Sequence, residues 1–110
     1  MAHRAEPLTE SYFYILLCLY RAPNHGYGIM QQALKLSKGS VRIGSGTMYG
    51  ATGNMMKKGW IEECPSDGGA FDRKRQYRLT DSGRQALLDE VERLRDLSQA
   101  AQDIIGGAGL

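Results

Sequence analysis

The feature that most restricts the fold is an apolar line with heptad-like spacing near the end of the chain. It consists of Leu87, Val91, Leu94, Ser98, Ala101 and Ile105. Thr80 precedes this line as a suitable N-cap, and Asp81 complements the helix dipole in the first turn. The spacing predicts one long helix over residues 80–105 with a seam for another helix. Because a chain of 110 residues buries only a thin core, we expect a second copy of the chain to cover this seam.

Helical spacing also dominates the first half of the chain. Apolar residues recur at i, i+3, i+4 and i+7 before Pro23, which ends a first amphipathic helix. Asn24 is a fair N-cap for a second helix, and Gly59 is placed as the stop of a third. The three helices are predicted at residues 9–22, 25–37 and 45–58. A minimal strand is predicted at residues 41–43, between the second and third helices.

Beyond Gly59 the pattern changes from helical to alternating. Residues 60–64 and 74–79 are predicted as two strands, joined by a dense turn sequence at residues 65–69. This order of elements predicts a mainly α fold with a small β-wing, a winged helix-turn-helix followed by a long C-terminal dimerisation helix. The expected division is a DNA-binding domain over residues 1–79, a dimerisation helix over residues 80–105 and a flexible tail over residues 106–110. Within the DNA-binding domain, the helix at residues 9–22 is also expected to contact the partner protomer.

The net charge of +2 conceals an asymmetry along the chain. Residues 35–84 carry ten basic and five acidic side chains, a net charge of +5. Residues 85–110 carry two basic and five acidic side chains, a net charge of −3. A basic middle segment favours a polyanion such as double-stranded DNA as partner. A mixed, solvated surface is the alternative explanation.

Two groups of residues are the candidates for DNA contact. The third predicted helix leaves small or polar residues on its outward face, and these are Ser45, Thr47, Tyr49, Gly50, Asn54 and Lys57. Hydroxyls and N-terminal N–H groups bind phosphate oxygens, and an Asn side chain can read adenine. The returning strand adds the densest basic run, which consists of Arg73, Lys74, Arg75 and Arg78. The alternatives are simple helix capping by Ser45 and Thr47, packing of Tyr49, and a solvated charge run.

Enzyme chemistry finds little support in the sequence. His3 and His25 are the only histidines and belong to no H-x-x-H or H-x-x-E motif, and Cys18 and Cys64 form no C-x-x-C pair. We therefore expect no catalytic site and no cofactor, and both cysteines as reduced thiols. His3 and His25 stay weak candidates for a regulatory metal.

The N-terminal residues lack a signal peptide, and no apolar run reaches the ~18 residues of a membrane span. We therefore expect no membrane association and a cytoplasmic location.

Four motifs in this order resemble the PadR family of bacterial transcriptional regulators. They are HGYGI at residues 25–29, GSGTMY at 44–49, GWI at 59–61 and RQYRLTDSGR at 75–84. The resemblance covers about residues 8–97, and the single last helix matches the short subfamily. It implies a homodimer built through the first and last helices, with the third helix as DNA reader. It further implies a repressor that leaves its promoter when a small hydrophobic or phenolic ligand, or less often a metal ion, binds near the dimer interface.

The apolar excess of the first helix is expected to meet the last helix at this interface. The candidate residues for an effector pocket or dimer interface are Tyr12, Tyr14, Ile15, Leu19, Leu87, Val91, Leu94 and Arg95. A packed seam without a pocket is the alternative. A winged-helix protein-interaction module without DNA binding is the alternative function, because the chain departs from the family pattern at Thr52 and near Asn54.

Overall fold

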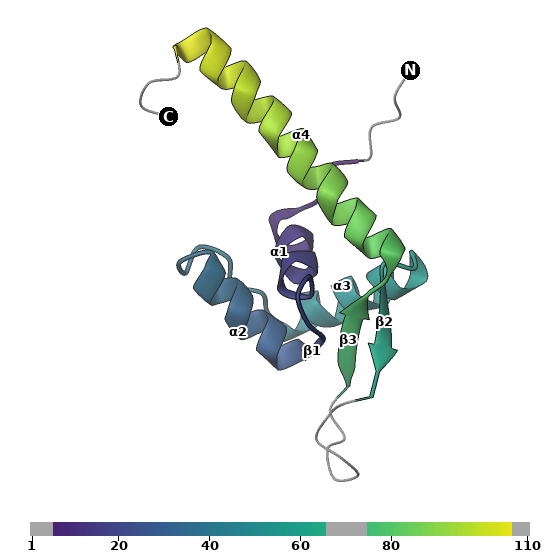
Figure 1. Ribbon diagram of the computed structural model, residues 1–110. Coiled ribbons are helices and arrows are strands. Elements are labelled where there is room, and N and C mark those ends of the chain that lie inside the picture. The colour runs from purple at the N-terminus through teal and green to yellow at the C-terminus, as the bar shows by residue number, and fades with distance from the viewer. Residues whose placement is uncertain (1–5, 66–74, 107–110) are drawn as a thin grey trace.

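The structure, a computed structural model, describes residues 6–65 and 75–106 (Figure 1). This part of the chain forms four helices and one three-stranded antiparallel sheet, so the predicted mainly α fold with a small β-wing is confirmed. The elements are α1 (Glu10–Cys18), β1 (Asn24–His25), α2 (Gly26–Leu36), α3 (Ser45–Lys57), β2 (Ile61–Cys64), β3 (Gln76–Leu79) and α4 (Asp81–Ile105). No helix in these ranges is long and apolar enough to cross a membrane.

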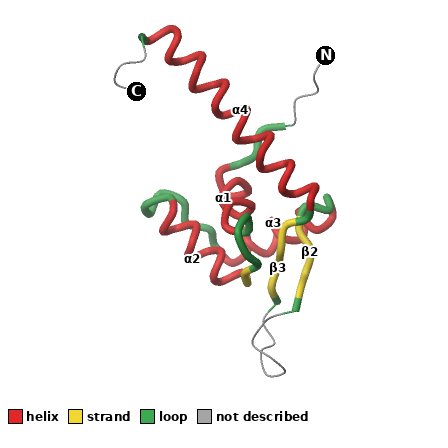
Figure 2. The backbone as a smooth tube through the Cα atoms, viewed as in Figure 1, coloured by secondary structure: helices red, strands yellow, loops and turns green. Residues whose placement is uncertain are grey.

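Helix α1 packs against both α2 and α4 (Figures 1 and 2). The core takes its fully buried side chains from all four helices, and these are Ile15 and Leu16 of α1, Ile29 of α2, Met55 of α3 and Leu87 of α4. Burying such a side chain contributes about 1.5–3 kcal/mol. Because each helix supplies only one or two of these residues, no helix can bury its apolar face without the others.

Side-chain caps fix the first turns of three helices. The Thr9 hydroxyl accepts a hydrogen bond from the Tyr12 N–H (3.1 Å), and the Thr80 hydroxyl accepts one from the Gly83 N–H (3.0 Å), which confirms Thr80 as the N-cap of α4. The predicted cap of α2 was wrong by one residue. His25 caps this helix, with its Nδ1 accepting from the Gly28 N–H at 3.1 Å. Asn24 instead begins β1, and its side-chain oxygen accepts from the His25 N–H at 2.8 Å.

The sheet has the order β1-β3-β2, with both pairs antiparallel. Its third strand is β1, whereas the predicted strand at residues 41–43 does not form. Val41 and Ile43 are buried, as their alternation suggested, but a side chain takes the place of a neighbouring strand: the Ser37 hydroxyl accepts the Val41 N–H at 2.8 Å. The edge of β3 that such a strand would need is occupied by Asn24 and His25.

Helix α4 leaves the body of the molecule and projects away from it with its second half (Figure 1). Its first turn packs tightly on the segment between α3 and β2, since a Cβ atom on Gly83 would lie 2.0 Å from the Trp60 carbonyl oxygen. The projecting half exposes apolar side chains, among them Leu97 (51%) and Ile104 (88%). Within one protomer, these side chains have no core to enter.

Candidate nucleic-acid interface

Helix α3 separates its residues cleanly into two faces. Met48, Ala51, Thr52 and Met55 are buried. All six residues expected on the outward face, from Ser45 to Lys57, are exposed, and Tyr49 is exposed to 80%. The buried Thr52 hydroxyl donates to the carbonyl oxygens of Met48 (3.0 Å) and Tyr49 (3.1 Å), so it needs no partner outside the helix. The helix thus presents a face of small and polar groups to solvent.

The N-terminus of α3 differs from those of the other helices. Gly44 is its N-cap, and no described side chain accepts a hydrogen bond from its first turn, whereas α1, α2 and α4 each have such a cap. The hydroxyls of Ser45 and Thr47 therefore do not cap the helix. Unpaired N–H groups and the positive end of the helix dipole favour an anionic oxygen, such as that of a phosphate group.

A shallow groove of about 320 Å³ connects α3 with α2 and the wing. Ser45 and Tyr49 line it from α3, Tyr27 from α2 and Tyr77 from β3. Tyr27 is exposed to 61%, and its hydroxyl accepts a hydrogen bond from the Gln31 amide at 2.9 Å. Sequence analysis missed Tyr27 as a surface residue. Its position opposite the buried pair Ile29 and Ala33 on the helical wheel was the signal for it.

Asn54, a predicted reader of bases, has a partner within the protomer. Its side-chain amide donates to the hydroxyl of Tyr12 on α1 at 2.9 Å. The contact is exposed, so it does not exclude a base as a competing partner, but it ties this part of α3 to α1. The structure thereby joins a residue expected at the DNA to one expected at the effector pocket.

The basic arm of the wing is only partly described, because Arg73 and Lys74 lie outside the described residues. Arg78 lies opposite Glu62 in the β2–β3 register, and its Nε is 3.2 Å from a Glu62 carboxylate oxygen. Arg75 makes a longer contact with Glu63, at 3.5 Å. Both pairs are exposed, and such pairs contribute about 0–1 kcal/mol, so a phosphate group can replace the carboxylate.

The residues expected at an effector pocket or dimer interface do not form one surface. Ile15, Leu19 and Leu87 are core residues of the protomer, which corrects their prediction, because the apolar face of α1 is covered by α2 and α4 of the same chain. Tyr14 and Val91 are partly buried, whereas Leu94 and Arg95 are exposed. Of the eight candidate residues, only Tyr12 lines the pocket of about 680 Å³ that is described next.

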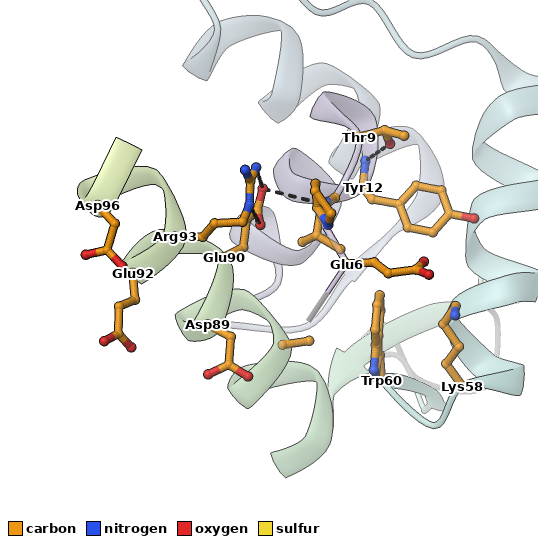
Figure 3. A pocket seen from close by; sticks show the side chains of 13 residues that line it. Glu6, Thr9, Tyr12, Lys58, Trp60, Asp89, Glu90, Glu92, Arg93 and Asp96 are labelled. Carbon is orange, nitrogen blue, oxygen red and sulfur yellow. Dashed lines mark hydrogen bonds and ion pairs between the residues drawn. The ribbon is translucent and has the colours of Figure 1, made fainter. Parts of the chain in front are cut away.

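This pocket, of about 680 Å³, lies between the N-terminal segment, α1, α4 and the turn after α3 (Figure 3). Glu90 and Arg93 form one wall as a bidentate ion pair, with both contacts at 2.7 Å. The Arg93 hydrogen bonds lower the pKa of the Glu90 carboxyl below its ordinary value, although its burial acts in the opposite direction. Glu90 also accepts the Leu8 N–H at 3.4 Å and so holds the N-terminal segment against α4.

Of the two candidate metal ligands, only His25 lies in the part of the chain that the structure describes. His25 uses its Nδ1 to cap α2, and His3 lies outside the described residues. The described residues contain no group of three or more His, Cys, Asp or Glu side chains that could hold a metal ion. Cys18 is buried near the Ile29 carbonyl, and burial raises the pKa of its thiol to about 11, so it stays protonated near neutral pH.

Comparisons with known proteins agree with this geometry. A family model described as the transcriptional regulator PadR-like family matches residues 15–89. No curated protein matches the chain.

Solved structures are similar over most of the chain. A PadR family transcription regulator from Clostridium difficile is 22% identical, with a TM-score of 0.73 over 88% of this chain and 99% of that chain. A PadR-like transcriptional regulator from Bacillus cereus is 20% identical, with a TM-score of 0.72 over 88% of this chain and 92% of that one. Bacillus subtilis PadR, solved in complex with operator DNA, is 25% identical, with a TM-score of 0.63 over 73% of this chain and 45% of that one.

Proposed function

Since the chain belongs to the PadR-like family of transcriptional regulators, we propose that it binds a palindromic DNA operator as a homodimer and represses transcription until a ligand binds. It acts through binding and not as an enzyme. Its place of action is the compartment that holds the chromosome, the cytoplasm in a prokaryote.

The observation that carries this proposal is the outward face of α3. Small and polar side chains, an uncapped helix N-terminus and the groove lined by Tyr27 and Tyr49 lie together next to the wing. A helix of this kind can enter the major groove of DNA while the wing contacts the backbone. Bacillus subtilis PadR, which shares the fold, is bound to operator DNA in its structure. We expect Ser45, Thr47, Tyr49, Gly50 and Lys57 at the DNA, with Tyr27 added to them.

The homodimer is supported by the projecting half of α4. Leu94, Leu97, Ile104 and Ile105 are exposed in the protomer, and an exposed apolar line on a helix favours a second helix beside it. Two copies related by a twofold axis present two α3 helices, which fits half-sites spaced by one or two turns of the DNA helix.

Ligand response is supported by the contact between Asn54 and Tyr12. Tyr12 lines the 680 Å³ pocket with its side chain and accepts the Asn54 amide of α3 with its hydroxyl. A ligand that displaces the Tyr12 ring must also change this contact. Such a change alters the reader helix and thereby the affinity for the operator.

The proposal is tested by fluorescence anisotropy with DNA fragments from the promoter region of the protein's own gene. We expect tight binding whose affinity falls steeply with salt, with Lys57→Gln weakening binding and lowering the salt slope by about 1. Arg84→Gln is the matched control, because the Arg84 guanidinium lies over the Tyr20 ring (4.8 Å) and does not line the groove beside α3. Absence of binding at low salt to every such fragment would contradict the proposal.

One observation favours the alternative of a protein-interaction module. Arg75 and Arg78 already pair with acidic residues of β2, and Asn54 pairs with Tyr12. In such a module, Lys57→Gln and Tyr49→Ala would leave the weak binding of any DNA unchanged. In a DNA-binding regulator, both substitutions reduce the affinity for the operator.

A further inference from the structure

The pocket beside Tyr12 has an acidic lining. Five carboxylates line it, those of Glu6, Asp89, Glu90, Glu92 and Asp96, against the two cationic side chains of Lys58 and Arg93. The Glu90–Arg93 ion pair is neutral as a unit. Even without Asp96, the carboxylates of Glu6, Asp89 and Glu92 outnumber the one ammonium of Lys58, so the described lining is negative and attracts a cation.

The opposite wall of the pocket is aromatic and already holds a cation. The rings of Trp60 and Tyr12 lie on this side of the pocket, and the Glu6 side chain lies beside them (Figure 3). The Lys58 ammonium lies 5.2 Å from the centroid of the Trp60 ring, within the range of a cation–π contact. Lys58 is exposed, and a lysine side chain is long and flexible, so another cation can replace its ammonium group over the Trp60 ring.

The size of the pocket fits a small organic molecule. A volume of about 680 Å³ lies within the range of roughly 300–1,000 Å³ that is usual for ligand pockets. The aromatic rings of Trp60 and Tyr12, with the carboxylates of Asp89 and Glu92 on α4 and of Glu6 beside the rings, match a ligand that carries both an apolar body and a positive charge.

We propose that this pocket binds an organic cation with an aromatic or other apolar body, with Trp60 and Tyr12 against the body and Asp89 and Glu92 near the charge. An aromatic acid of similar size is disfavoured, because its carboxylate would face the negative lining. An organic cation is thus the ligand class that we propose for the ligand response described above. Its effect on operator binding rests on the proposed function. Binding itself is measured on the protein without DNA, so failure of either one leaves the other intact.

The test uses two ions of the same shape and opposite charge, tetraphenylphosphonium and tetraphenylborate. Trp60 is the only tryptophan of the chain, so its fluorescence reports on this pocket. We expect a saturable change in Trp60 fluorescence with tetraphenylphosphonium, confirmed by isothermal titration calorimetry, which weakens as salt is added. Tetraphenylborate should bind at least about ten-fold more weakly.

A pair of variants on α4 separates the pocket from the general charge of the helix. Asp89 lines the pocket and accepts the Gln85 amide at 2.8 Å, while Asp103 lies outside it and accepts the Gln99 amide at 2.9 Å in the same i, i+4 arrangement. We expect Asp89→Asn to weaken tetraphenylphosphonium binding about three-fold and Asp103→Asn to leave it unchanged.

The proposal is overturned by any of three results. They are equal or tighter binding of tetraphenylborate, equal effects of the two Asp→Asn substitutions, and absence of saturable heat or fluorescence change up to about 1 mM tetraphenylphosphonium. Melting temperatures of both variants close to that of the unmodified protein show that the comparison concerns binding and not folding.

Discussion

Glu90 shows how a single residue holds the two ends of the chain together. Its side chain is only 4% exposed, yet it is charged, because Arg93 binds both carboxylate oxygens and the Leu8 N–H donates to one of them. A buried carboxylate is tolerated only with such partners. The same three groups fix the position of the N-terminal segment that lines the pocket.

The pKa of Glu90 leads to a prediction on acid stability. Since folding lowers this pKa from its ordinary value of 4.5, the charged carboxylate stabilises the fold above that pH, and the contribution is lost as the pH falls through the lower, folded-state pKa. We expect the free energy of unfolding, measured by urea denaturation, to fall as the pH drops below about 5. The fall should be smaller in Glu90→Gln. Equal pH dependence of the two proteins would show that Glu90 does not contribute.

Gly83 gives a second prediction at the scale of one residue. Its Cβ in Gly83→Ala would lie 2.0 Å from a backbone oxygen of Trp60, so the start of α4 must move. We expect a loss of about 3 kcal/mol in the free energy of unfolding, measured by urea denaturation.

The matched control for Gly83→Ala is a helical glycine without neighbours. A Cβ at Gly50 meets nothing within 4 Å, so Gly50→Ala should stabilise α3 by up to about 1 kcal/mol. Its open surroundings in the protomer agree with a role for Gly50 in close approach to a partner. A stabilised Gly50→Ala protein that binds operator DNA less well would support this role, and unchanged affinity would argue against it.

At the scale of elements, α1 and α3 are linked by the hydrogen bond between Tyr12 and Asn54. If Asn54 reads a base, the Tyr12 hydroxyl competes with the DNA for the same amide. We therefore expect Tyr12→Phe to raise the affinity for operator DNA up to about five-fold, with no change for random DNA, as measured by fluorescence anisotropy. Asn54→Ala should lower the affinity for the operator.

Tyr20→Phe is the control for this comparison, because the Tyr20 ring contacts Arg84 and the amide of Asn54 donates to Tyr12 instead. It should leave both affinities unchanged. If Tyr12→Phe and Tyr20→Phe behave alike, the Tyr12 hydroxyl does not compete for Asn54.

At the scale of the whole molecule, the projecting half of α4 is the basis of the proposed homodimer. The second half of this helix projects from the body of the molecule (Figure 2). This half exposes Leu97 and Ile104 to solvent, although Leu87 anchors the first half of the same helix in the core. We expect Leu97→Glu to raise the dimer dissociation constant more than about ten-fold, because a charge would be buried without a partner. Sedimentation equilibrium measures this constant.

Gln99→Lys is the control for the dimer, since it adds a charge on the side of α4 away from Leu97. It should leave the dissociation constant unchanged and place a lysine four residues before Asp103. A protein that is monomeric before any substitution would contradict the homodimer and, with it, the palindromic operator.

Sequence reasoning predicted the presence and order of the helices and the wing because their causes are local, although α1 ends at Cys18 and not at residue 22, just before Pro23. Apolar residues at helical spacing identified α1 to α4, the Thr80 hydroxyl identified the start of α4, and the outward residues of α3 followed from the positions of its buried methionines. Each of these features depends on residues within about one or two turns of one another.

Contacts between distant segments were decided only by the tertiary structure. A helical pattern shows that one face is buried, but it does not show what covers that face. Ile15 and Leu19 therefore entered the protomer's own core and not an interface, and Asn24 with His25 took the edge of β3 in place of residues 41–43. The contact of Asn54 with Tyr12, 42 residues away, and the acidic pocket beside it exist only because folding brings α1, α3 and α4 together.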